Sequence, residues 1–149
     1  MKQYIGTKII KAEPAYRVDG KVFVKANIVP SGVRIEDGYK VIYPDGYESW
    51  SPKDVFEAAY RATDGMSFGL AIEAAKMGKR IARAGWNGKN QYVELASCIS
   101  YKNSAGEIVN VEHDAIGNKA LAFVGTSGVQ MGWLASQADM LADDWRIVE

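Results

Sequence analysis

The sequence predicts an α+β fold, in which a mainly antiparallel sheet carries a few short helices, arranged as two small modules. Short segments rich in β-branched and aromatic residues alternate with turn signals such as Asp19-Gly20, a pattern that favours hairpins. Only three segments carry a signal for the start of a helix. A polar break at residues 63–65 divides the chain into residues 1–64 and residues 65–149.

The first module is expected to begin with short strands. Residues 4–13 fit one or two strands that end before Pro14, because proline has no N–H to donate to a sheet ladder. Residues 15–29 are predicted to form a hairpin around Asp19-Gly20, and residues 38–43 are predicted to form a further strand.

A helix should follow these strands. Ser51 is placed to cap it, Pro52 suits the first helical position and Asp54 lies in the first turn, so the helix is predicted to run to about Ala62. Trp50 directly precedes the cap and is expected to pin the helix to the sheet. This structural role is favoured over ligand binding.

The second module is expected to open with a helix that begins at Ser67 as N-cap, runs through Met77 and stops at Gly78 in a left-handed conformation. A helix that is apolar on more than one side usually packs against more than a sheet, so we expect a second subunit and a homo-oligomer. The apolar positions of this helix are Phe68, Leu70, Ala71, Ile72, Ala74 and Ala75.

Alternating apolar and polar residues predict the strands of the second module. Ser136 and Asp139 form a capping-box pattern that should start a short helix to about Leu141. Trp145 is expected in the core of a last strand, and residues 125–128 are interpreted as a flexible loop. The strands are expected at residues 79–83, 92–95, 99–101, 108–111, 120–124 and 145–148, with residues 120–124 as the best candidate for a central strand.

Charge and hydropathy exclude two classes of partner. Eighteen basic residues balance eighteen acidic ones, so there is no overall field to hold a long nucleic acid. The longest apolar run, residues 120–124, is far shorter than the ~20 residues that cross a bilayer, and the N-terminus lacks the apolar stretch of a secretory signal. We therefore expect no membrane partner and a cytoplasmic location.

Few residues are available for metal or redox chemistry. The single cysteine, Cys98, excludes an intrachain disulfide, and with one histidine, His113, a Cys/His zinc site has too few ligands. Cys98 is expected to be buried and His113 to be a solvated surface residue. Asp139, Asp143 and Asp144 could hold magnesium, but helix capping explains the first and a solvated helix end explains the other two.

Catalytic motifs are missing from the sequence. It contains no nucleophile elbow, no phosphate loop, no dinucleotide fingerprint and no His-rich metal motif. We therefore expect a protein that is not an enzyme and that has no catalytic residues, no metal and no cofactor.

Two tryptophan-containing stretches supply binding chemistry instead. Trp86 and Trp133 each follow a glycine, which allows the backbone to approach a flat ligand while the indole ring stacks on it. Core packing is the competing interpretation. Asn87, Ser136 and Gln137 add neutral donors and acceptors that suit the edge of a base or ribose.

Two arginines lie just before the first of these stretches. Arg80 and Arg83 are interpreted as sharing one strand face, where they could pair with the phosphates of a small nucleotide. Two exposed strand charges with no ligand are an equally open interpretation.

Residues 66–149 contain three distinctive motifs: Met66-Ser67-Phe68-Gly69, Gly85-Trp86-Asn87-Gly88-Lys89 and the stretch from Gly132 to Trp145. In these motifs the segment resembles the Thoeris anti-defence proteins of the second type, a family of phage proteins. Residues 1–64 depart from the family pattern as an additional module, and residues 96–119 are longer and more polar than a compact sheet connection requires.

The resemblance implies a protein that binds the cyclic ADP-ribose isomers made by bacterial TIR immune enzymes and holds them uncleaved in the host cytoplasm. Some members also bind cyclic oligonucleotide signals, and assembly into tetramers places the pockets between subunits. Under this interpretation Trp86 and Trp133 would stack on the ligand, Asn87, Ser136, Gln137 and Asp139 would hydrogen-bond its polar edges, and Arg80, Arg83 and Lys89 would face the pyrophosphate.

Two other functions stay open at this level. One is an enzyme that degrades such a nucleotide, and the other is a phage structural or protein-interaction module whose tryptophans belong to the core. Recovery of intact ligand after denaturation separates sequestration from degradation, and the absence of any ligand effect would favour the structural module.

Overall fold

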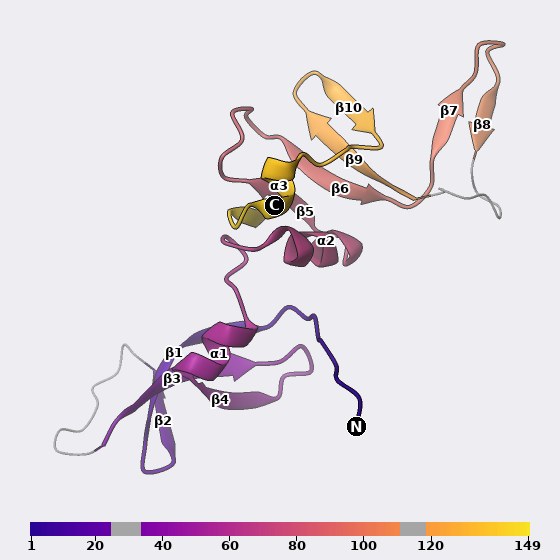
Figure 1. Ribbon diagram of the computed structural model, residues 1–149. Helices are drawn as coiled ribbons and strands as arrows, with labels where there is room; N and C mark the ends of the chain where they lie inside the picture. Colours follow the sequence, from indigo (N-terminus) through magenta and orange to yellow (C-terminus); the bar gives the residue numbers. More distant parts are fainter. Residues whose placement is uncertain (25–33, 111–118) are drawn as a thin grey trace. The chain divides into compact units, whose positions relative to one another are not determined.

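The computed structural model describes residues 1–24, 34–110 and 119–149, and it divides into two compact units, Met1–Arg61 and Ala62–Glu149 (Figure 1). His113 and the end of the hairpin expected at residues 15–29 lie outside the described residues. All strand pairs are antiparallel among the described residues, and helices are few and short, so the α+β expectation holds with sheets predominating.

The first unit contains a four-stranded sheet in the order β2-β1-β3-β4. The predicted hairpin is confirmed, because Val18 pairs with Lys21 around Asp19 and Gly20, which both have positive φ. The strand end expected before Pro14 is wrong. Pro14 instead lies inside β1, opposite Tyr39 of β3. The elements are β1 (Lys11–Val18), β2 (Lys21–Val24), β3 (Glu36–Ile42), β4 (Glu48–Pro52) and α1 (Lys53–Ala59).

Helix α1 begins without the predicted serine cap. Ser51 belongs to β4, where it pairs with Tyr39 of β3, and the N-cap is Pro52 with no side-chain hydrogen bond. The helix also ends at Ala59, earlier than expected. The sheet ladder therefore takes precedence over the local capping signal. Tyr39 attaches the helix instead, since its ring stacks on Phe56 at 4.1 Å.

Trp50 has a structural role, but it pins the sheet and not the helix. Ser51, the next residue in β4, pairs with Tyr39, whose ring contacts α1. Because side chains alternate along a strand, Trp50 lies on the opposite face of the sheet. The indole Nε1 donates to the Ala15 carbonyl at 3.1 Å, and the Arg17 guanidinium lies 4.2 Å from the ring centroid. The ring covers Gly38, where a side chain would have no room.

The second unit contains a five-stranded sheet in the order β10-β9-β6-β5-β11 and a separate two-stranded sheet formed by β7 and β8 (Figure 1). The strand expected to be central, β9, lies inside the sheet, but β6 is the middle strand. The elements are α2 (Phe68–Lys76), β5 (Arg80–Arg83), β6 (Tyr92–Ala96), β7 (Ser100–Lys102), β8 (Ile108–Asn110), β9 (Ala120–Gly125), β10 (Gly128–Met131), α3 (Gln137–Leu141) and β11 (Trp145–Val148).

Most local signals in this unit are confirmed. Ser67 caps α2 by accepting from the Leu70 N–H at 3.4 Å, and Gly78 follows the helix with a φ of 88°. The expected loop at residues 125–128 is a tight hairpin turn instead, because Gly125 pairs with Gly128.

The core of the second unit lies between α2 and one face of the sheet. Its best-buried residues include Trp145, Ile81 and Val93, each 0% exposed. The alanines of α2 are small enough to let the helix approach the sheet closely.

Cys98, expected to be buried, is exposed because it follows the end of β6 and lies outside this sheet. No helix among residues 1–24, 34–110 and 119–149 is long and apolar enough to span a bilayer.

The contact between Trp50 and Gly38 yields a first prediction. A Cβ atom at Gly38 would collide with the Ser51 carbonyl oxygen and with the Trp50 ring, so Gly38→Ala should destabilise the first unit by about 1–3 kcal/mol, as overpacking typically does. Amide hydrogen exchange of β1 and β3 measures this loss without interference from the second unit. Gly6→Ala is the matched control, because nothing lies within 4 Å of a Cβ there. Equal protection in both variants would contradict the packing described.

Candidate ligand-binding site

The two predicted tryptophans lie together in an aromatic cluster of the second unit. Trp86, in the connection between β5 and β6, and Trp133, between β10 and α3, have ring centroids 6.0 Å apart and ring planes at 74°. Both pack against the core while remaining partly exposed, whereas Trp145 is fully buried at 5.3 Å from Trp86. The cluster is completed by Phe68 of α2 and Phe123 of β9.

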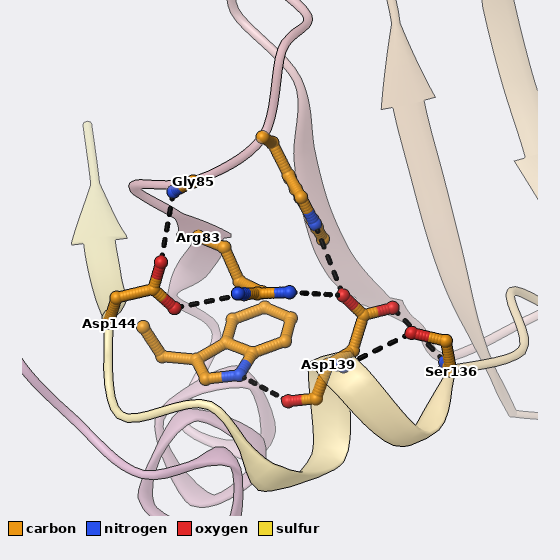
Figure 2. Close-up of polar contacts among 7 residues, drawn as sticks. Arg83, Gly85, Ser136, Asp139 and Asp144 are labelled. Atoms are coloured by element: carbon orange, nitrogen blue, oxygen red, sulfur yellow. Dashed lines mark hydrogen bonds and ion pairs between the residues drawn. The ribbon is translucent and has the colours of Figure 1, made fainter.

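Asp139 of α3 forms hydrogen bonds that connect two tryptophans of this cluster to Arg83 and to the start of α3 (Figure 2). Its Oδ1 accepts from Trp86 Nε1 at 3.3 Å and from Arg83 Nη1 at 3.0 Å. Its Oδ2 accepts from the Ser136 N–H and its own N–H donates to Ser136 Oγ, both at 3.1 Å, which confirms the predicted capping box. Its backbone carbonyl accepts from Trp145 Nε1 at 2.8 Å. One residue therefore orients two indole rings and the start of α3.

Asp144 supplies the second carboxylate of the network. Its Oδ1 accepts from Arg83 Nε at 2.9 Å, and its Oδ2 accepts from the Gly85 N–H at 2.9 Å (Figure 2). The Arg83 side chain is only 20% exposed, so its guanidinium is largely withdrawn from water between the two carboxylates. The backbone just before Trp86 is thus fixed by a residue nearly sixty positions away in the sequence.

The network holds both carboxylates in the ionised form. Hydrogen bonding to the Arg83 guanidinium lowers the pKa of Asp144 against the opposing effect of desolvation, with help from the Gly85 N–H. Burial raises the pKa of Asp139, but the backbone and hydroxyl of Ser136, the guanidinium and the Trp86 indole together lower it below its ordinary value. Both aspartates in turn raise the pKa of Arg83.

The two arginines do not share a strand face. Arg80 and Arg83 are three positions apart, and side chains alternate along a strand, so they lie on opposite faces of β5. Arg80 pairs with Glu94 at 3.4 Å and lies 4.6 Å from the Tyr92 ring centroid. The expectation that the two arginines share one strand face is therefore wrong.

The other predicted residues differ in how available they are to a ligand. Asn87, Lys89 and Gln137 are exposed. Ser136 is exposed as well, and its hydroxyl accepts the capping bond from the Asp139 N–H. The structure thus leaves Trp86 and Trp133 partly exposed, together with exposed polar side chains from the same two stretches.

Several residues of the site were missed from the sequence or given another role. Asp144 was interpreted only as part of a carboxylate cluster or a solvated helix end, and the contribution of the Gly85 N–H was not foreseen. No local pattern signals this role, because the partners of Asp144 lie 61 and 59 residues away in the sequence. No group of three or more His, Cys, Asp or Glu residues in the described part of the chain is arranged to hold a metal ion.

The fold and the site define a class of protein. It is a small domain with a five-stranded antiparallel sheet and an aromatic cluster, in which the partly exposed Trp86 donates to Asp139 and Asp139 pairs with Arg83.

Comparison with known proteins identifies the particular family. Residues 66–148 match the model of the Tad2-like family, described as the Thoeris anti-defense 2-like domain, and the chain belongs to this family. A relative from Bacillus phage SP01, "Thoeris anti-defense 2", is 39% identical over 88 residues, which cover 56% of this chain and 94% of the relative. The resemblance inferred from the sequence is confirmed, and family membership places the chain among phage anti-defence proteins.

Removal of the guanidinium tests the importance of the network. Arg83→Met leaves two partly buried carboxylates without their counterion, so it should lower the free energy of unfolding by about 2–4 kcal/mol. Denaturation followed by tryptophan fluorescence reports mainly this unit, which contains Trp86, Trp133 and Trp145. Arg80→Met is the matched control, and loss of its exposed pair should cost at most about 1 kcal/mol. Equal effects of the two variants would show that the network does not stabilise the fold.

The lowered pKa values of Asp139 and Asp144 predict how stability responds to acid. A carboxylate whose pKa is lower in the folded state stabilises the fold above its unfolded pKa, near 3.8, and this contribution is lost as the pH falls through the folded value. The free energy of unfolding should therefore drop below about pH 3.8. Arg83→Met should lose less stability over the same interval. If the free energy of unfolding fell equally with pH in the wild type and in Arg83→Met, Arg83 would not be the cause of the lowered aspartate pKa values.

Proposed function

We propose that the Ala62–Glu149 unit binds a cyclic ADP-ribose-type signalling nucleotide and sequesters it without cleavage. The observation that carries the proposal is the pair of partly exposed rings of Trp86 and Trp133, whose centroids lie 6.0 Å apart. Membership of the Thoeris anti-defense 2-like family supports an anti-defence role for this surface. The action is proposed to take place in the host cytoplasm.

Each part of the proposed surface suits a different part of such a ligand. The indole rings offer flat apolar faces for a base, and indole faces also attract cationic groups such as a ribosylated adenine ring. Exposed Asn87 and Gln137 can donate to and accept from the base and ribose edges. Exposed Lys89 can meet a phosphate as a point charge. Asp139 and Arg83 would act indirectly, by holding Trp86 in place.

Two further features belong to the proposal. Cyclic oligonucleotides share the bases and phosphates to which this surface is suited, so they are proposed as additional ligands.

The unit is also proposed to act as a homo-oligomer, with a tetramer as the expected form. Large apolar side chains left in solvent support assembly, since Leu134 is 87% and Leu141 is 78% exposed.

Calorimetric titration of the full chain with a TIR-derived cyclic ADP-ribose isomer tests the proposal, followed by heat denaturation and chromatography of the released ligand. We expect saturable binding and recovery of unchanged ligand. A new product formed with turnover would instead establish a degrading enzyme. Absence of binding, to cyclic oligonucleotides as well, would leave a structural or protein-interaction module.

Substitution of the exposed lysine tests the assignment of the surface. Lys89→Ala should weaken nucleotide binding by roughly 10- to 100-fold, because a charge-assisted hydrogen bond to phosphate is lost. It should leave stability unchanged, since Lys89 is exposed. Lys102→Ala, which removes an exposed lysine of β7, is the matched control and should bind as the wild type does. Equal nucleotide affinities of Lys89→Ala and Lys102→Ala would show that the nucleotide does not bind beside Lys89.

A further inference from the structure

A hollow of about 310 Å³ lies in the second unit, where the second half of α2 meets β6 and β9. Its walls are aliphatic, and they come from Ile72 and Ala75 of α2, Leu95 of β6, and Ala120 and Leu121 of β9. None of these residues belongs to the surface proposed for the nucleotide. The volume falls at the lower end of the range found for small-molecule sites, which are mostly apolar with a few polar groups.

The register of the sheet explains why the hollow exists. Leu95 pairs with Leu121 on the same sheet face as Val93, two residues before Leu95. Val93 is fully covered, whereas Leu95 and Leu121 remain partly exposed. Helix α2 ends at Lys76, and the small side chain of Ala75 faces inward near that end. Among the residues that the structure describes, none fills the space over Leu95 and Leu121 beyond the helix end.

The rim of the hollow is positively charged. Lys76 and Lys119 both line it, and no acidic residue from the described part of the chain does. Lys76 forms a 3.3 Å ion pair with Glu73, but its side chain is 61% exposed, which leaves the ammonium group open to a second anion. Lysine side chains of this kind lay their methylene stems along an apolar wall and keep the charged end in water. An apolar floor beside two ammonium groups is complementary to a molecule with one apolar and one anionic part.

We propose that this hollow is a second binding site, which accepts a small amphiphilic anion. The compact apolar body would cover Leu95 and Leu121, and a single carboxylate, sulfonate or phosphate would lie beside Lys76 and Lys119. Burial of the apolar body supplies the attraction, and the ammonium groups select an anion over a neutral analogue. This site is independent of the nucleotide proposal because the two share no residue.

The test uses the full chain labelled with ¹⁵N and two probes of equal length, sodium octanoate and octan-1-ol. Titration is followed by the amide chemical shifts. We expect saturable shifts at Ile72, Leu95 and Leu121, with octanoate binding at least threefold more tightly than octanol. Lys119→Glu should weaken octanoate binding roughly three- to tenfold, because an attraction becomes a repulsion, and should leave octanol binding unchanged.

Lys102→Glu makes the same change of charge on β7, at a residue that does not line the hollow, and should bind octanoate as the wild type does. Three results would overturn the proposal: equal affinity for octanoate and octanol, equal weakening by the two charge reversals, or saturable shifts that map only to residues outside the hollow. Absence of any shift up to tens of millimolar octanoate would overturn it as well. None of these outcomes depends on whether the protein binds a nucleotide.

Discussion

The second unit depends on one electrostatic arrangement, in which the Arg83 guanidinium lies between the carboxylates of Asp139 and Asp144. These three side chains come from β5, α3 and the approach to β11, so the network joins segments that are distant in the sequence. A guanidinium and two carboxylates withdrawn from water stabilise a fold only when each is paired, so their geometry is demanding. The same carboxylates also hold the Gly85 backbone and the Trp86 indole, which couples the stability of the unit to the shape of its candidate site.

The aromatic cluster serves packing and recognition together. Trp145 is completely buried, and its one polar group is satisfied by the Asp139 carbonyl, so burial of the indole leaves no unpaired donor. Trp86 and Trp133 pack on the same core but stay partly exposed. Core packing and ligand stacking, which competed as interpretations of the sequence, are therefore compatible. The buried side of each ring makes it rigid, and a rigid ring loses little entropy when a ligand stacks on it.

The two units cover the faces of their sheets with different kinds of side chain. In the first unit Trp50 lies over Gly38 on one sheet face, while Tyr39 stacks on Phe56 of α1 on the other. In the second unit α2 covers the sheet with small alanines and leaves an aliphatic floor open beyond its end. The family match covers only the second unit, and the functional proposals concern that unit alone.

Features that depend only on neighbouring residues could be predicted from the sequence: the Asp19-Gly20 turn, the Ser67 cap and the capping box of Ser136 and Asp139. Its family motifs also identified the anti-defence family. The pairing of Ser51 in a strand and the binding of Arg83 to two aspartates could not be predicted and are seen only in the folded structure. The physical reason is distance along the chain, because turns and caps are closed by atoms a few residues apart. The partners of Arg83 lie 56 and 61 residues away and are brought together only when the sheet and α3 have formed.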